Sequence, residues 1–301
     1  QQQQQQQAAL AEQQRRMQQM KISEQHSRAA QHAPSPPPLQ HMQHSPTPSP
    51  HDSRTTSATS RSPSADPLLA TQSPQAAGSA RRVLRVPDQF DSITAAIQAA
   101  RPEDQIQVSA GHYMESIELV DAVVDILGNG NMQHILLDAP AGTSALSQQG
   151  GYVRISNMML RSNGLAPTVR TQKGKLMIED CNISGGKIGI TAENGCQMDI
   201  KRSVLCRCER QGLYLGGTSV AVLESCSVFE NGDHGILVMQ GATSIDMTKS
   251  MVSYNQGAAL AIDQGASAKV ENNDLRNNVQ GPCLVGVQSQ HLVSVTNNLT
   301  T

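Results

Sequence analysis

Aromatic side chains are almost missing from this 301-residue chain, which has no Trp, 2 Phe and 4 Tyr. A core built on large aromatic residues is therefore excluded, and the small and branched aliphatic residues suit a narrow interior. An excess of one charge is also lacking, because 23 Lys and Arg stand against 25 Asp and Glu. This balance gives no basic surface for nucleic acid, and no apolar run is long enough to span a bilayer. We therefore expect neither a nucleic-acid partner nor membrane insertion.

Cysteine is present, but not in a metal-binding pattern. The 6 Cys include one C-x-C, at Cys206 and Cys208, and no C-x-x-C, so neither a metal nor a cofactor is expected. We interpret them as free, buried thiols that pack as small apolar side chains in a reducing compartment. This interpretation predicts an intracellular, cytoplasmic protein, with a cytoskeletal or nuclear position as alternatives.

What the sequence does contain is a repeat of about 23 residues that begins near Val153 and is typical of a stacked solenoid. One apolar set recurs in step at Ile155, Ile178, Ile200, Leu223, Met247, Val270 and Val295. A second follows at Leu160, Ile183, Leu205, Val228, Val252 and Leu275. A file of mostly small residues lies at Met158, Cys181, Ser203, Cys226, Ser250, Asn273 and Asn298. A turn file lies at Asn163, Gly186, Cys208, Asn231, Asn255 and Asn278.

The content of each repeat predicts its architecture. Short runs alternate with period two, as at Met198 and Ile200, and no helical stripe of ten or more residues occurs. The framework of a leucine-rich repeat is absent, whereas short strands between Gly and Asn turns favour an all-β parallel β-helix. Successive turns would lie about 4.8 Å apart, so equivalent side chains would stack. We expect the regular turns to occupy residues 153–301.

The region 82–152 is expected to start the solenoid. Val83, Leu84 and Val86 predict a first strand, and Asp91 or Ser92 can cap a short helix over residues 93–100 that covers the first turn. Irregular early turns would follow. No amphipathic segment follows the last repeat, so we expect a fragment, or a far end closed by a partner or a missing domain.

Residues 1–81 have a different composition and are expected to form a disordered Gln/Pro/Ser-rich tail. Proline-directed phosphorylation of this tail would add up to about two negative charges per site. The candidate sites are Ser35, Ser45, Thr47, Ser49, Ser62 and Ser73.

The segment FDSITAAIQAARPEDQIQVSAGHYMESIELVDAVVDILGNG resembles the first turn of right-handed parallel β-helix proteins of the pectin-lyase-like superfamily. In those proteins a short helix leads into a G-x-Y-x-E turn and a strand ending in G-x-G. The matching residues are Gly111, Tyr113, Glu115, Gly128 and Gly130. The resemblance covers about residues 83–301 and implies a right-handed parallel β-helix, with Glu115 as a marker of the fold.

Catalysis on such a fold requires two carboxylates about 5 to 10 Å apart, or carboxylates with cationic partners. The stacked columns place Glu179 beside Lys201, and Asp180 beside Arg202, which is typical of solvated charge ladders. His234 is expected to share a polar file with Gln211, Gln256 and Gln280. No pectinesterase-like or polygalacturonase-like motif is visible, so we predict no catalytic residues and no enzyme.

One outward-facing file is unusually apolar. Counting along the second strand of each repeat gives Gly189, Tyr214, Leu237, Ala259 and Cys283. An apolar strip on a solenoid indicates either a docking surface for a partner or the place where the chain's own tail lies. Tyr214, Leu237, Ala259 and Cys283 are therefore the predicted partner-binding residues.

The later repeats, such as SCSVFENGDHGILVMQGAT, most resemble the Shc SH2-domain-binding protein family of cytokinesis and spindle factors and the F-box β-helix adaptors. The resemblance implies a non-catalytic scaffold that binds protein partners. One alternative is the substrate-recognition subunit of a ubiquitin ligase, although no F-box helical segment lies between the tail and the first turn. The other is a carbohydrate-binding or carbohydrate-active protein with a glycan partner, against which the scarcity of Trp and Phe counts.

Overall fold

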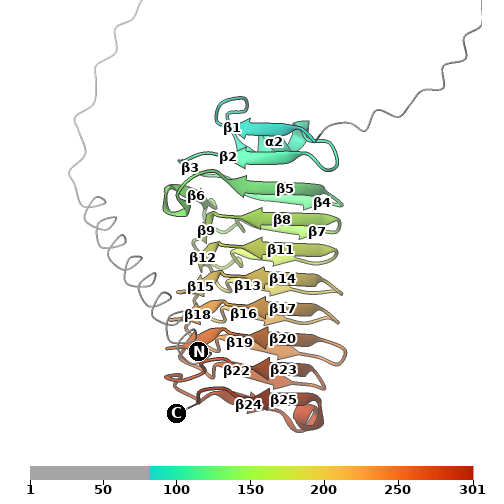
Figure 1. Ribbon diagram of the computed structural model, residues 1–301, viewed down its shortest axis with the longest axis vertical. Helices are drawn as coiled ribbons and strands as arrows, with labels where there is room; N and C mark the ends of the chain where they lie inside the picture. Colours follow the sequence, from blue (N-terminus) through green and yellow to red (C-terminus); the bar gives the residue numbers. More distant parts are fainter. Residues whose placement is uncertain (1–80, 301) are drawn as a thin grey trace, which may run out of the picture. The chain divides into compact units, whose positions relative to one another are not determined.

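The computed structural model describes residues 81–300, which coil into a parallel β-solenoid (Figure 1). The predicted all-β, parallel β-helix architecture is therefore confirmed. The predicted tail, apart from Arg81, and all six candidate phosphorylation sites from Ser35 to Ser73 lie outside the described residues. No described helix is long and apolar enough to cross a membrane.

Three parallel sheets form the walls of the solenoid, and the chain visits them in turn. Sheet A is the ten-stranded sheet β1(Val83–Val86), β2(Gln105–Val108), β5(Val123–Gly128), β8(Tyr152–Ser156), β11(Lys175–Glu179), β14(Gln197–Lys201), β17(Val220–Glu224), β20(Ser244–Thr248), β23(Ser267–Glu271) and β25(Val293–Thr296). Sheet B is the seven-stranded sheet β3(Gly111–Tyr113), β6(Ile135–Asp138), β9(Met159–Ser162), β12(Asn182–Gly185), β15(Val204–Cys206), β18(Ser227–Phe229) and β21(Met251–Ser253). Sheet C is the eight-stranded sheet β4(Ile117–Val120), β7(Leu146–Gln149), β10(Val169–Thr171), β13(Ile190–Ala192), β16(Leu213–Leu215), β19(Ile236–Met239), β22(Leu260–Asp263) and β24(Cys283–Val285).

The interior consists of files of aliphatic side chains. Ile178 pairs with Ile200, and Ile200 pairs with Leu223, in the register that the repeat predicts. All three are buried. On sheet B, Ile183 pairs with Leu205 in the same way. Because alternate residues of a strand face opposite sides, each strand contributes its apolar residues to the interior and its polar residues to the surface.

At the corner between sheets A and B, two adjacent residues of each turn change the direction of the chain. The first has a left-handed backbone conformation, for example Arg202 with φ 48° and Ser225 with φ 56°. The second points inward and joins a ladder, in which the Cys181 amide donates to Ser203 Oγ at 3.1 Å and the Cys226 amide donates to Ser250 Oγ at 3.1 Å. The predicted file of small residues is therefore a hydrogen-bonded ladder.

Helix α2(Ile93–Ala99) covers the first turn of the solenoid. The Ser92 hydroxyl accepts from the Ala95 amide, which selects Ser92 over Asp91 as the N-cap. The Glu115 carboxylate accepts from the Ile93 amide at 2.9 Å and from the Thr94 amide at 2.8 Å. Glu115 therefore fixes the capping helix to the G-x-Y-x-E turn. Two short 3₁₀ helices, η1(Met132–His134) and η2(Val287–Leu292), lie in later connections.

The cysteines are free thiols, and only Cys283 is partly exposed. Cys181 and Cys226 lie two turns apart with Ser203 between them, so they do not bridge. Burial raises the pKa of the Cys181 thiol to about 12 and that of the Cys226 thiol to about 11. These thiols are neutral and pack as small apolar side chains.

Candidate functional site

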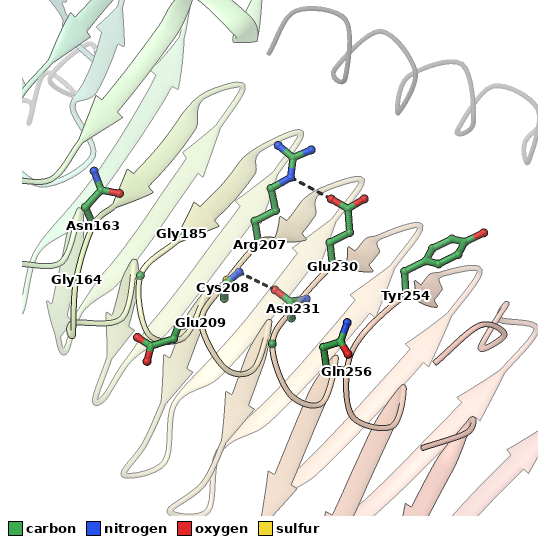
Figure 2. Close-up of a pocket in the computed structure, with 12 residues that line it drawn as sticks. Asn163, Gly164, Gly185, Arg207, Cys208, Glu209, Glu230, Asn231, Tyr254 and Gln256 are labelled. Atoms are coloured by element: carbon green, nitrogen blue, oxygen red, sulfur yellow. Dashed lines mark hydrogen bonds and ion pairs between the residues drawn. The ribbon is translucent and has the colours of Figure 1, made fainter. Parts of the chain in front are cut away.

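A groove with a volume of about 610 Å³ crosses several turns at the corner between sheets B and C (Figure 2). Its walls come from the loops that follow β9, β12, β15, β18 and β21. The residues lining it are Asn163, Gly164, Gly185, Gly186, Arg207, Cys208, Glu209, Glu230, Asn231, Gly232, Tyr254 and Gln256. Equivalent loops of successive turns lie side by side, so the groove follows the long direction of the solenoid.

A second ladder forms the rigid base of this corner. The Cys208 amide donates to Asn231 Oδ1 at 3.1 Å, and Asn231 Nδ2 donates to Asn255 Oδ1 at 2.8 Å. Asn255 Nδ2 in turn donates to Asn278 Oδ1 at 2.9 Å. Asn suits this position because its side-chain amide both donates and accepts hydrogen bonds. Each Asn can therefore bond to the preceding turn and to the following turn. The predicted turn file of Asn is thus the support of the groove.

One row of the groove consists of residues that immediately precede the ladder. Arg207, Glu230 and Tyr254 have φ of 57, 55 and 58, so their side chains point away from the ladder (Figure 2). Arg207 Nε lies 3.0 Å from Glu230 Oε2, which joins two adjacent turns. The side chain of Tyr254 is largely solvent-accessible, since the residue is 59% exposed.

A second row lies on the other side of the ladder and contains Glu209, Gly232 and Gln256 in successive turns. The Glu209 amide donates to the Gly186 oxygen at 2.9 Å, and the Gln256 amide donates to the Asn231 oxygen at 3.0 Å. A Cβ on Gly232 would collide with the backbone oxygen of Glu209. Glycine is therefore required at position 232, and Glu209 and Gln256 project from the groove wall with a gap between them.

The charges near the groove are mostly paired. Besides the Arg207–Glu230 pair, Arg210 lies 3.8 Å from Asp233, and Gln211 Nε2 donates to Asp233 Oδ2 at 2.6 Å. Within residues 81–300, no group of three His, Cys, Asp or Glu side chains is arranged to hold a metal ion. The groove thus presents amides, carboxylates and one phenol to a ligand.

The prediction for His234 needs correction. The Gly235 amide donates to the Ala258 oxygen, so His234 neighbours Ala258 in the next turn, while Gln256 neighbours Gly232. His234 Nδ1 accepts from the Ala258 amide at 2.9 Å. His234 therefore bridges two turns of backbone, and of the three Gln residues predicted to share its file only Gln211 is in line with it.

The predicted apolar strip is also partly wrong. Tyr214 pairs with Leu237, as expected, but Leu237 pairs with Ala261, and Ala261 pairs with Leu284. Ala259 is fully buried at the corner beside Gly235, and Cys283 pairs with the inward residue Leu260. Gly189 lies at the same corner, where the Ile190 amide donates to the Gly212 oxygen. The outward strip is therefore Tyr214, Leu237, Ala261 and Leu284, which we call the sheet C strip.

Sequence reasoning missed a charged cluster on sheet B. Asp138 accepts from Arg161 Nε at 3.0 Å, and His112 Nε2 lies 3.0 Å from its other oxygen. Burial would raise the pKa of Asp138, but hydrogen bonds from Arg161 and His112 outweigh this, and the pKa is lowered. The cluster ties β3, β6 and β9 together. His112 and Asp138 come from turns before the regular repeat, so no column indicated that they lie beside Arg161.

The groove residues Glu209 and Gln256 were not predicted as a site either. The Asn file beside them was visible, but the sequence does not indicate which loops leave space above it. The signal in the sequence was Gly232, which lies between the polar residues Glu209 and Gln256 of the turns on either side.

Comparison with known proteins places this geometry in a family. The family model described as right handed β-helix region matches residues 144–299. This match does not support the finer resemblance to the Shc SH2-domain-binding family or the F-box adaptors. Comparison with curated protein sequences gave no match.

Two solved structures illustrate the shared fold. The A-module of a mannuronan C-5 epimerase from Azotobacter vinelandii aligns with a TM-score of 0.53 and 16% identity, over 69% of this chain and 73% of that chain. A pectin methyl esterase from the rice weevil aligns with a TM-score of 0.51 and 12% identity, over 76% of this chain and 91% of that chain. At these identities the likeness shows the fold alone.

The prediction that the chain is not an enzyme is contradicted by these neighbours. Both are enzymes, so the absence of a familiar pectinesterase-like or polygalacturonase-like motif gives no ground for excluding catalysis on this fold. The matched region spans just over half of the chain and coincides with the stacked turns described above. The chain therefore belongs to the right-handed β-helix family.

Proposed function

We propose that this protein binds a carbohydrate chain in the groove between sheets B and C. The observation that carries the proposal is the groove itself, in which hydrogen-bonding side chains and an exposed Tyr line an open path across successive turns. An extended polymer repeats along its length, and the solenoid offers equivalent positions about every 4.8 Å. A repeating ligand therefore suits a repeating surface.

The chemistry of the lining supports this ligand class. Amides such as those of Asn163 and Gln256 both donate and accept hydrogen bonds, as sugar hydroxyls do. The carboxylate of Glu209 accepts hydrogen bonds, and such charge-assisted bonds are stronger than neutral ones. Tyr254 offers an aromatic face with a polar end, which suits the less polar face of a sugar ring.

The names of the structural neighbours also support a carbohydrate ligand. They describe an enzyme of mannuronan and an esterase of pectin, and both substrates are polysaccharides. This agreement favours the carbohydrate interpretation over the protein-scaffold interpretation.

A carbohydrate-active role is a natural extension of this proposal. Glu209 and Glu230 both line the groove and come from adjacent turns. Glu230 is bound to Arg207, whereas no described side chain pairs with the Glu209 carboxylate. Hydrolysis of a glycosidic bond uses two carboxylates that flank the bond. We assign Glu209 as the candidate acid and Glu230 as the candidate base or nucleophile.

Affinity electrophoresis in gels that contain single polysaccharides tests the binding proposal. Migration of the wild-type protein should be retarded by at least one polymer, and Tyr254→Ala should reduce the retardation because the ring contact is lost. Val279→Ala, an exposed residue outside the groove lining, is the matched control. Unretarded migration in every polymer would refute the proposal.

The catalytic extension is tested with the retained polymer. Release of new reducing ends by hydrolysis should occur with the wild type, and Glu209→Gln should abolish this release while retaining binding. Turnover that survives in both Glu209→Gln and Glu230→Gln would refute the assignment.

Protein docking on the sheet C strip is the second candidate function. Tyr214 and Leu237 are half-buried, and Leu284 is exposed at 42%, so an apolar line runs along the outside of this sheet. Charged replacements at Tyr214 and Leu237 should then weaken partner capture without unfolding the chain. Unchanged capture of every partner would reject this function.

A further inference from the structure

We infer that the groove selects an uncharged polysaccharide over a polyuronate. This inference rests on the proposed function and names the substrate class. The substrates of the structural neighbours would not suggest an uncharged polymer, so the inference depends on the charged side chains of the groove itself.

Among residues 81–300, three charged side chains line the groove, namely Arg207, Glu209 and Glu230. Two are acidic, and the single cation is bound to one of them, with Arg207 Nε 3.0 Å from Glu230 Oε2. The lining therefore carries one net negative charge.

The nearest cations outside the groove are also accounted for. Arg210, just beyond the lining, has its Nη2 atom 3.8 Å from Asp233 Oδ2. Lys187 is the neighbour of Glu209 in the preceding turn, since its backbone oxygen accepts from the Arg210 amide at 2.8 Å, but it does not line the groove. In the part of the chain that the structure describes, the lining therefore offers no row of cations to match a row of carboxylates on a ligand.

A uronate in each sugar would bring a carboxylate towards Glu209, and like charges placed together at an interface repel each other. A polymer of neutral sugars has hydroxyls instead, which donate to Glu209 and exchange hydrogen bonds with Asn163 and Gln256. The lining therefore binds hydroxyl groups more favourably than carboxylates.

Affinity electrophoresis with matched polymers tests the inference. The uncharged probes are soluble glucan, xylan and mannan, and the charged probes are polygalacturonate and polymannuronate. We expect retardation by at least one uncharged probe and weaker or no retardation by the polyuronates. That retardation should be nearly the same at low and high salt, since exposed charge attraction alone is screened by salt.

Reversal of the charge at Glu209 tests the inference more directly. Glu209→Lys should weaken binding of the uncharged polymer by about tenfold and create salt-sensitive retention by polyuronate, whereas Glu209→Gln should not create it. Lys173→Gln, at an exposed lysine outside the groove lining, is the matched control and should change neither probe. Far-UV circular dichroism shows whether each variant is folded, and the exposed position of Glu209 leaves the interior files untouched.

The outcomes separate the two claims. Salt-sensitive retention of the wild type by polyuronates alone would overturn this inference and leave carbohydrate binding standing. Retention by no polymer would overturn the proposed function, and the inference with it.

Discussion

Two adjacent residues in each turn decide how the corners of the solenoid form. The first adopts a left-handed conformation, as Tyr254 does with φ 58, and the second turns its side chain inward, as Asn255 does. Left-handed backbone costs roughly 1–2 kcal/mol for most residues. This cost is tolerated because the inward side chain then completes the hydrogen bonds of two neighbouring turns.

Replacement of Asn255 tests the contribution of the ladder to stability. Asn255 is fully buried, donates to the oxygens of Val228 and Ser253 at 3.2 Å, and accepts from the amide of Asn231 at 3.1 Å. Asn255→Ala leaves several of these groups unsatisfied, so we expect the free energy of unfolding to fall by about 2–4 kcal/mol. Urea denaturation measures it.

The matched control for this change is the next residue. Gln256 is exposed and outside the ladder, so Gln256→Ala should alter stability by less than about 0.5 kcal/mol. Equal losses in the two variants would show that the ladder adds nothing specific.

At the scale of elements, the strands and their files were predictable, whereas exact positions at corners were not. Ile178, Ile200 and Leu223 recur because the interior accepts only aliphatic residues, and that selection is visible in the sequence. The predicted strip is wrong at Ala259 because Ala259 is the neighbour of Gly235, so the residue in line with Leu237 is Ala261, two positions later. A shift of one residue moves a side chain to the other face of a strand, which is how Cys283 was exchanged for Leu284.

The capping helix offers a prediction at this scale. The Glu115 carboxylate accepts from two backbone amides of α2 and from the Thr94 hydroxyl at 2.6 Å. Glu115→Ala should lower the free energy of unfolding by about 2 kcal/mol, because these donors lose their partner. Thermal denaturation measures the change, with the exposed Glu118→Ala as control. A neutral Glu115→Ala would contradict the role of Glu115 in holding the helix.

Acid sensitivity should also arise in the first turn. Asp104 is buried and accepts hydrogen bonds from Arg82, and from the Arg101 amide at 2.7 Å. These bonds lower the pKa of Asp104 from 3.8 to about 2. The stability that the ionised carboxylate provides is therefore complete above pH 4 and is lost as the pH falls from about 4 to 2.

Comparison with Asp104→Asn measures this effect. The difference in Tm between wild type and Asp104→Asn should be constant near neutral pH and should shrink as the pH falls below 4. A difference that does not change between pH 4 and pH 2 would contradict the lowered pKa.

At the scale of the whole molecule, stacking converts a local sequence period into a long, regular surface. The ladder under Cys208, Asn231 and Asn255 keeps the loops above it in step, and the groove runs across those loops. The period predicted the ladder but not the groove, because the space depends on loop residues such as Gly232 that repeat irregularly. Function on this fold therefore depends on the loops more than on the files.

Nuclear magnetic resonance mapping of a bound oligosaccharide tests the central claim, that the groove between sheets B and C binds carbohydrate, most directly. On titration of the 301-residue protein with an oligosaccharide of the retained polymer, we predict that the amide signals of Glu209, Gly232 and Tyr254 shift together. Signals of the sheet C strip, such as Leu237, should not shift. Shifts confined to the sheet C strip, or no shifts at saturating oligosaccharide, would contradict the account.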